Sequence, residues 1–459
     1  MYWWTTKEVH KGLAISERAF DVALIGSGPA SIAALQGLRG GASIAVVSGT
    51  SRHIVPRASV HPKIQAVSVS SSEMPGVAPA YRRSVGRGRP LFSAASTGGF
   101  ANYWGQQFLR YECGDPWPRE IFDDFAAYLD HCDEVEQGFV LSGGADLAVR
   151  AGGQHGYVAR VPRLLIGAVQ DPASNLKAMR HAFYVQAERT RAQVFDTRAN
   201  SIESAQGGWR VLLQDEAPIF AKKVILAAGV LGTSQLIGNS FPDIDRLRLS
   251  DHAPWMLYSI GLRRLFAERP PGHRHHFNAI TLEKLEERVC AAFASLYDMG
   301  RADMNLMLAS TIGRSFGALR SVRAPVGAGL IKPIQIWTPS TFEDVDIYPR
   351  DGTAHEVASP KSTPHDDPQL LEMLNVLRGL GARCLKISRT IPGCGFHYHN
   401  LRVAAAGGSE VPVVDYLRER AGDGVVCVDA SVLSSIGTRP HTLTAMAASL
   451  QISKRLVMQ

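Results

Sequence analysis

The stretch FDVALIGSGPASIAALQGLRGGASIAVVSGT, residues 20–50, decides the fold. The apolar run at 20–25 predicts a buried strand, residues 30–38 predict a helix, and residues 43–47 predict a second strand. Glycines between the first strand and the helix let the chain turn tightly there. A strand–helix–strand unit of this kind is typical of a parallel sheet, so we expect an α/β fold.

The turn also fits a phosphate-binding fingerprint. Gly26 allows the tight turn, Gly28 lets a pyrophosphate approach the backbone, and Ser31 is small enough for close helix–strand packing. The helix that starts at Pro29 and Ala30 would then present free N–H groups to a phosphate, from Ala30 onward because proline has no N–H. Ordinary α/β proteins can show the same glycine pattern, so the fingerprint needs support from the rest of the chain.

The end of the second strand departs from the usual pattern. Ser48 stands where an acidic residue normally binds the ribose hydroxyls of a dinucleotide. Ser48 and Thr50 could form weaker hydrogen bonds there, and Arg52 could contact a phosphate instead. The sequence therefore leaves open what replaces the missing carboxylate.

Length and composition limit the class of protein. A chain of 459 residues favours two domains, and 45% apolar with 20% charged residues is ordinary for a soluble globular protein. No apolar run reaches the ~20 residues of a membrane span, and the first residues lack the order of a secretory signal. The net charge of +7 comes from scattered basic residues. We therefore expect a cytoplasmic protein with neither nucleic acid nor membrane as partner.

Four further segments, each different in sequence, follow one another along the chain. They are STGGFANYWGQQF (96–108), AKKVILAAGVLGTSQLI (221–237), LSDHAPW (249–255) and the long C-terminal stretch at 411–449. Together with the first turn, they resemble the glucose–methanol–choline (GMC) family of FAD-dependent oxidoreductases. The loop GG…YWG and the motif HTLTAM look most like the pyranose-oxidase side of that family.

The resemblance implies an α/β plus α+β fold with a discontinuous FAD-binding domain. That Rossmann-like domain would comprise residues 18–115, 190–252 and 395–459. Residues 116–189 would form a helical or lid insert. Residues 253–394 would form a substrate-binding domain built on an antiparallel sheet.

The implied cofactor is FAD, bound without a covalent link. Some relatives attach FAD through a His just before the Trp of the aromatic loop, and here that position reads Tyr103-Trp104. Asp429 would reach the ribityl or pyrophosphate region, or else cap a turn. The expected FAD contacts are Gly26, Gly28, Pro29, Ala30, Ser48, Gly98, Gly99, Asn102, Tyr103, Trp104, Ala228, Gly229, Asp429, Ala430, Thr442 and Leu443.

The chemistry implied is oxidation of an alcohol to a carbonyl by hydride transfer to flavin N5, which needs a base for the hydroxyl proton. In the resembling family, a His paired with a second His or Asn faces N5. GCGFHYHNLRV (393–403) offers His397 and His399, and RPHTL offers His441. The glycine of the family's H-x-x-G segment is Asn400 here, so His399 stays an alternative to our choice, His397. The helix from Thr442 would stabilise negative charge on the flavin.

The expected partners are an alcohol substrate and an electron acceptor. The substrate would be a sugar, a glycoside, a cyclic alcohol or a natural-product hydroxyl, and the acceptor would be oxygen or another oxidant. Two alternatives stay open: a lyase or isomerase on the flavin scaffold, and a binding protein that has lost FAD. We expect no metal site, because the cluster His273, His275 and His276 fits a solvated turn without a second ligand segment.

Overall fold

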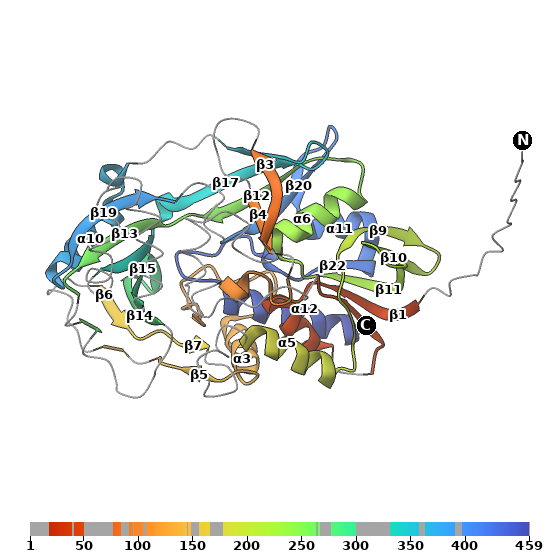
Figure 1. The fold of residues 1–459 in the computed structure, drawn as a ribbon, viewed down its shortest axis with the longest axis horizontal. Coiled ribbons are helices and arrows are strands. Elements are labelled where there is room, and N and C mark those ends of the chain that lie inside the picture. The colour runs from red at the N-terminus through yellow and green to blue at the C-terminus, as the bar shows by residue number, and fades with distance from the viewer. Residues whose placement is uncertain are drawn as a thin grey trace, which may run out of the picture.

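The computed structural model describes residues 18–38, 41–49, 77–83, 91–94, 96–103, 107–144, 146–147, 156–165, 178–262, 265–266, 277–299, 331–357, 363–390 and 397–458. Its helices α1 (Pro29–Gly37), α6 (Gly229–Ser240), α11 (Val413–Ala421) and α12 (Thr442–Met458) gather around one sheet at the right of Figure 1, and an antiparallel sheet with α10 (Pro368–Gly379) lies at the left. The long strands β12 (Ile244–His252), β17 (Phe342–Tyr348) and β20 (His399–Ala405) run along the top between them.

The first sheet contains the strand–helix–strand unit of the opening stretch. Its strand order is β8-β2-β1-β11-β10-β9, with β22 also paired to β11. All its strands except the β9–β10 hairpin run parallel to one another. The strands are β1 (Arg18–Ile25), β2 (Ile44–Val47), β8 (Gln193–Phe195), β9 (Ala199–Ala205), β10 (Gly208–Leu213), β11 (Ile219–Leu226) and β22 (Val425–Cys427). The runs VALI and IAVV are almost wholly buried, because parallel strands are covered on both faces.

Helices from both ends of the chain cover this sheet. α1 (Pro29–Gly37) packs on α12 (Thr442–Met458), and α12 also contacts α3 (Phe125–Glu136). A Cβ on Gly37 would lie 2.9 Å from the Leu450 carbonyl oxygen, so glycine permits this close approach. Three more helices lie next to this sheet or its helices: α5 (Ala178–Arg189) beside α1, α6 (Gly229–Ser240) beside β9, and α11 (Val413–Ala421) beside β22.

The second sheet corrects one expectation from the sequence. Its strand order is β21-β20-β12-β17-β18-β3-β4. Its strands are β3 (Val77–Arg83), β4 (Leu91–Ala94), β12 (Ile244–His252), β17 (Phe342–Tyr348), β18 (Thr353–Glu356), β20 (His399–Ala405) and β21 (Glu410–Pro412). The Gly-, Pro- and Ser-rich region 50–115 predicts long loops only, and there the prediction is wrong for β3 and β4. β3 pairs with β18, which lies far along the chain, so no local pattern reveals it.

The third sheet is the antiparallel sheet expected beyond residue 253. Its strand order is β19-β13-β16-β15-β14-β6, and α10 (Pro368–Gly379) packs against one face. Its strands are β6 (Tyr157–Arg160), β13 (Trp255–Ile260), β14 (Phe277–Glu286), β15 (Val289–Met299), β16 (Lys332–Trp337) and β19 (Arg383–Arg389). A short pair, β5 (Leu141–Ser142) with β7 (Leu164–Leu165), lies apart. The α/β plus α+β fold class is thus confirmed, and the domain boundaries stay a prediction.

Several predicted elements change in detail. The helix predicted around 119–139 begins only at Phe125, because the Asp124 carboxylate accepts the Ala127 N–H at 2.7 Å and caps it. The alternating segment 192–214 with its Gly-Gly turn predicts a hairpin, and β9 and β10 confirm it, whereas β8 at the start of the segment pairs in parallel with β2. No helix in the described part of the chain is long and apolar enough to cross a lipid bilayer.

Candidate active site

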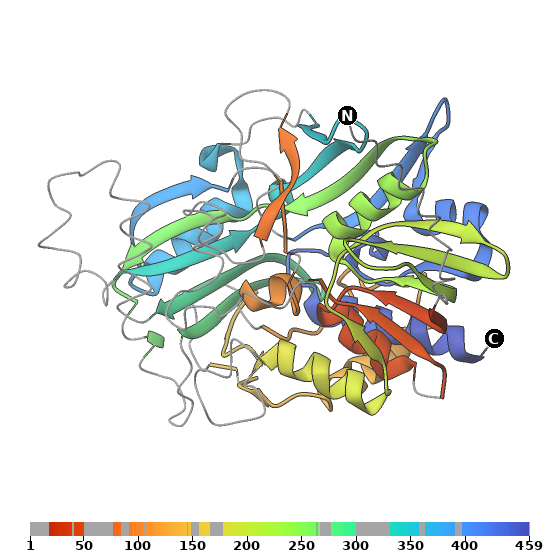
Figure 2. The same ribbon diagram turned by 45° about the vertical axis from the view of Figure 1, so that its right-hand side comes forward.

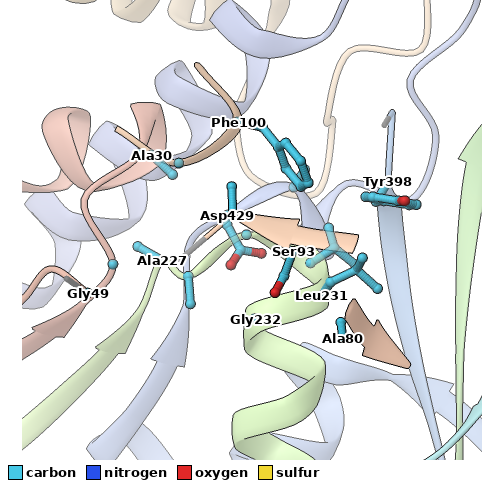
Figure 3. A pocket seen from close by; sticks show the side chains of 18 of the residues that line it. Ala30, Gly49, Ala80, Ser93, Phe100, Ala227, Leu231, Gly232, Tyr398 and Asp429 are labelled. Carbon is cyan, nitrogen blue, oxygen red and sulfur yellow. The ribbon is translucent and has the colours of Figure 1, made fainter. Parts of the chain in front are cut away.

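A cavity of about 460 Å³ is lined by residues from all three sheets. Figure 2 shows the three sheets converging near the middle of the molecule. α1, α6 and α12 all begin at its wall. Figure 3 shows Ala30 and Gly49 on one side of it, with Phe100, Asp429 and Tyr398 across from them. Because helix N-termini carry partial positive charge, the cavity favours an anionic group without a ring of basic side chains.

Gly26 makes the first turn possible. Its φ of +125° is unfavourable for other residues, and an added Cβ would lie only 2.1 Å from the Ala227 carbonyl oxygen. The turn is held on both sides: the Gly26 N–H donates to the Val47 carbonyl at 2.9 Å, and the Ala227 N–H donates to the Ile25 carbonyl at 2.8 Å. The turn therefore brings the ends of β1, β2 and β11 together at the cavity.

Gly28 has a different role, because its open side faces the cavity. It caps α1 in an extended conformation (φ −80°, ψ −171°), with Pro29 as the first helical residue. The nearest heavy atom to an added Cβ is the Gly98 carbonyl oxygen at 3.9 Å. Ala30 lines the cavity, and Ser31 is buried beneath, with its Oγ 3.4 Å from the Ala227 carbonyl oxygen. The open space at Gly28, its lack of a side chain and the N-terminus of α1 together make a site that fits a pyrophosphate.

The end of the cavity near β2 contains Ser48, which stands where a ribose-binding carboxylate is usual. Ser48 lines the wall, but its Oγ lies 3.2 Å from the Gly49 carbonyl oxygen and 3.4 Å from that of Phe195, so it bonds to backbone. Arg198 and Asn200 also line this end, and sequence reasoning did not select them. Thr50 and Arg52 lie outside the described residues.

The glycine loop after β4 closes over the first turn. Gly98 and Gly99 adopt φ values of +92° and +56°, and the Gly98 N–H donates to the Ser27 carbonyl at 3.1 Å. Gly99 lines the cavity, whereas Gly98 lies just behind it. Asn102 and Tyr103 belong to the 3-10 helix η2 (Gly99–Tyr103), but their side chains, like all of Trp104, lie outside the described residues. The absence of a covalent FAD link therefore stays a prediction.

Asp429 lies at the cavity wall and is fully buried. Its carboxylate accepts hydrogen bonds from the Thr233 hydroxyl at 2.5 Å and from the Ser431 N–H at 2.9 Å, and burial raises its pKa. It thus caps a turn and also faces the cavity, as Figure 3 shows. Three neighbours expected to contact FAD line the same wall: Ala228, Gly229 and Ala430.

Two of the candidate histidines meet at the far end of the cavity. The ring centroids of His397 and His441 are 5.5 Å apart, and the rings are nearly perpendicular at 75°. His441 directly precedes α12, whose first residue, Thr442, also lines the cavity, while Leu443 is buried under the helix. His399 points elsewhere: its Nδ1 lies 3.0 Å from the His397 carbonyl oxygen, and it is not among the described lining residues.

The surroundings of His397 fix its position. Its backbone N–H donates to the Asp251 carboxylate at 3.0 Å, and its ring stacks on Trp337 with centroids 5.2 Å apart and planes 9° apart. Behind it, burial lowers the pKa of His252 to about 3 and that of His399 to about 4. These two neighbours are therefore uncharged at neutral pH and add no positive charge to the pair.

A buried ion-pair cluster anchors the loop that carries His441. Arg439 is 3% exposed and pairs with Asp115 and with Glu283, the latter at 2.7 Å. Next to it, the Thr438 hydroxyl donates to the Cys290 carbonyl at 2.5 Å. The cluster ties the start of α12 to β14 and β15. Nothing in the sequence pattern singled it out, because its members lie far apart in the chain.

Other lining residues that the sequence did not reveal come from the third sheet and the segment before it. Gln107, Tyr297 and Trp337 line the cavity at its histidine end. The alternation in FASLY (293–297) and IQIW (334–337) carried a signal, since every second residue there is polar or aromatic. His273, His275 and His276 lie outside the described residues. Within the described ranges, no group of three or more His, Cys, Asp or Glu side chains could hold a metal ion.

Comparison with known proteins bears on the fold. No protein-family model matches the sequence, and no curated protein matches it. Among solved structures, the chain is similar to pyridoxine 4-oxidase from Mesorbium loti, with a TM-score of 0.60 and 14% sequence identity over 95% of this chain and 98% of that one. At this identity the similarity shows a shared fold alone, and it does not test the resemblance to the pyranose-oxidase side.

Proposed function

We propose that the protein is an FAD-dependent oxidoreductase that oxidises an alcohol to a carbonyl. One observation carries the proposal: His397 and His441 face each other at 5.5 Å on a cavity that also holds the glycine turn of a dinucleotide site. The shared fold with an oxidase named for pyridoxine adds support.

The residues present fit FAD. Gly28 leaves space for the pyrophosphate, and the first turn of α1 offers the N–H groups of Ala30 and Ser31, because the helix itself provides them no acceptor. Arg198 and Asn200 are the candidates for the ribose end that lacks a carboxylate. When FAD is bound, the chemistry that it supplies is acceptance of a hydride at flavin N5.

His397 is the proposed base. A substrate hydroxyl placed between the two histidines would give its proton to the His397 imidazole. Asp251 and Trp337 hold that imidazole in place through its backbone and its ring face. His397 as a whole is only 5% exposed, so water does not compete freely for the proton.

His441 is the proposed second contact to the hydroxyl. It lies at the N-terminal end of α12, where unpaired N–H groups favour negative charge. The same helix end would stabilise charge that arrives on a bound flavin. The position of His399 at the start of β20, away from the cavity lining, supports His397 over His399 as the base.

The proposed substrates remain the alcohols expected from the sequence, with pyridoxine added because of the similar fold. Oxygen or another oxidant would take up the electrons. A location in the cytoplasm and the absence of nucleic-acid or membrane partners belong to the same proposal.

The test is anaerobic mixing of the purified flavoprotein with an alcohol panel, followed by flavin absorbance. His397→Asn should keep FAD and slow flavin reduction by about 10²–10⁴-fold, the usual contribution of a general base. His365→Asn, at an exposed site away from the cavity, is the matched control.

Other outcomes would replace the proposal. Slow reduction in His399→Asn with normal reduction in His397→Asn would make His399 the base. Conversion of substrate with the flavin still oxidised would indicate a lyase or isomerase. A colourless protein that binds no added FAD would indicate a binding protein.

A further inference from the structure

The third sheet has one apolar face and one polar face, and both are buried. The apolar face packs on α10 and includes Ile280, Leu282, Ala292, Ala294, Leu296, Ile334 and Ile336. The opposite face carries Thr281, Glu283, Ser295, Tyr297 and Gln335, each at most 5% exposed. Buried polar groups need hydrogen-bonding partners, so the second face requires an explanation other than core packing.

Part of that face forms a hydrogen-bonded cluster with Gln107. The Gln107 side-chain amide donates to the Ser295 hydroxyl at 3.0 Å and lies 3.5 Å from the Tyr297 hydroxyl, which in turn lies 3.4 Å from the Gln335 side-chain oxygen. Only the first distance is usual for a hydrogen bond, and the other two are long and weak. A ligand atom could therefore replace these long contacts with shorter ones at little cost.

The cluster is next to the proposed catalytic pair. Gln107 and Tyr297 line the same cavity as His397 and His441. On β16, Gln335 is two residues from Trp337, which stacks on His397, so both side chains leave the same face of the strand. A molecule whose hydroxyl lies between the histidines would extend toward the cluster.

The charge balance of the wall limits what can bind there. Histidines aside, only Arg198 and Asp429 carry a formal charge among the described lining residues, and Asp429 is bonded to Thr233 of α6. Burial raises the pKa of Tyr297 to about 12, so its phenol stays protonated and can donate. Glu283, on the same sheet face, is paired with Arg439. A charged group at the cluster would thus lack a partner, which is costly in a buried site.

We infer that Gln107 and Tyr297, held from behind by Ser295 and Gln335, form a binding subsite for an uncharged alcohol that carries a second hydrogen-bonding oxygen or nitrogen. The subsite selects substrates by neutral hydrogen bonds from an amide and a phenol. This inference rests on the proposed function, since it places the reacting hydroxyl at the histidine pair.

Two matched series of ring alcohols test the subsite. The first is benzyl alcohol, 3-hydroxybenzyl alcohol and 3-(hydroxymethyl)benzoate; the second is cyclohexanol, cyclohexane-1,3-diol and 3-hydroxycyclohexanecarboxylate. Binding to the FAD-loaded protein is measured by calorimetry, and flavin reduction is measured separately by anaerobic stopped flow. The neutral member with a second hydroxyl should bind tightest in each series, by about 3- to 10-fold per hydrogen bond gained.

Two variants assign the effect to the cluster. Tyr297→Phe and Gln107→Met should remove the 3- to 10-fold preference for the second hydroxyl, seen as a higher Kd and KM for that member of each series relative to its monofunctional alcohol. Tyr157→Phe is the control, because Tyr157 is a buried tyrosine of the same sheet that does not line the cavity.

Each outcome supports or overturns the inference. Tightest binding by a carboxylate or by the monofunctional alcohol, unchanged preference in both variants, or no binding in either series overturns the subsite. The expected binding order without flavin reduction supports the subsite and counts against the proposed function.

Discussion

Replacement of Gly28 by valine should separate cofactor binding from folding. Gly28 has extended backbone angles (φ −80°, ψ −171°) that a β-branched residue adopts readily. The first atom that a Cβ would meet is 3.9 Å away, an ordinary contact distance. The apoprotein should therefore fold, and its melting temperature should stay the same or rise slightly, since valine restricts the unfolded chain.

The loss in FAD affinity follows from the bonds that the valine methyl groups would block. The first turn of α1 offers the Ala30 and Ser31 N–H groups to a phosphate, and hydrogen bonds to a charged group contribute about 1.5–3 kcal/mol each. Loss of two such bonds costs about 3–6 kcal/mol, which corresponds to about a 10²–10⁴-fold higher Kd. Gly28→Ala, with one methyl group at an ordinary distance, should lose much less.

The assay is titration of each apoprotein with FAD, read by flavin fluorescence, next to thermal melting without FAD. Gly26→Ala is the contrasting variant, because its Cβ would lie 2.1 Å from the Ala227 carbonyl oxygen and should destabilise the apoprotein itself. Wild-type FAD affinity in a folded Gly28→Val variant would refute a phosphate site at this turn. An unfolded Gly28→Val apoprotein would refute the steric argument.

Three further predictions concern stability and cofactor release. Arg439→Met should lower the free energy of unfolding by about 3–5 kcal/mol in denaturant titration, because Asp115 would stay buried without its cation; a loss under 1 kcal/mol would contradict this. Acid or heat should release FAD into solution, since Tyr103 replaces the His of covalent relatives, and flavin that stays on the denatured chain would contradict it. The free energy of unfolding should fall by about 2 kcal/mol each for His252 and His399 as the pH drops from about 6.5 to 5. Burial lowers the pKa values of these histidines in the folded protein to about 3 and 4, so the unfolded chain takes up the protons first. Urea titrations of wild type and His399→Gln at both pH values check this.

Local sequence patterns were enough to predict the elements that have strong apolar periodicity or clear turn residues at their ends. β1, α1 and β2 follow from an apolar run, a glycine turn and a second apolar run, and α12 begins at Thr442 as its position after Pro440-His441 predicts. β3 and β4 were missed because the Gly-, Pro- and Ser-rich segment around them predicts loops; the two strands pair with each other, and β3 joins the second sheet through β18, far along the chain. The hairpin predicted over 192–214 is confirmed by β9 and β10, but the sequence does not reveal that β8 pairs with β2, which is remote in the chain.

The candidate site was predictable where residues lie in recognisable segments. The turn at Gly26 and Gly28 and the pair His397 and His441 were selected on that basis, and the structure brings all four to one cavity. Gln107 and Arg439 belong to no motif. Their surroundings consist of side chains from distant strands, so only the folded chain identifies them.

The first sheet joins β1, from the start of the chain, to β22, from its end, through β11. The site can therefore form completely only after the last part of the chain has been synthesised. The glycine turn leaves the ribosome long before α12, which at 5–20 residues per second means a delay of roughly 20–80 s. Throughout that interval, the face of α1 that packs on α12 in the folded protein is not yet covered by α12. We expect nascent chains to present an apolar surface there, which makes this stretch a target for chaperones. A chain cut before residue 425 would accordingly keep the glycine turn but aggregate before it could bind a nucleotide.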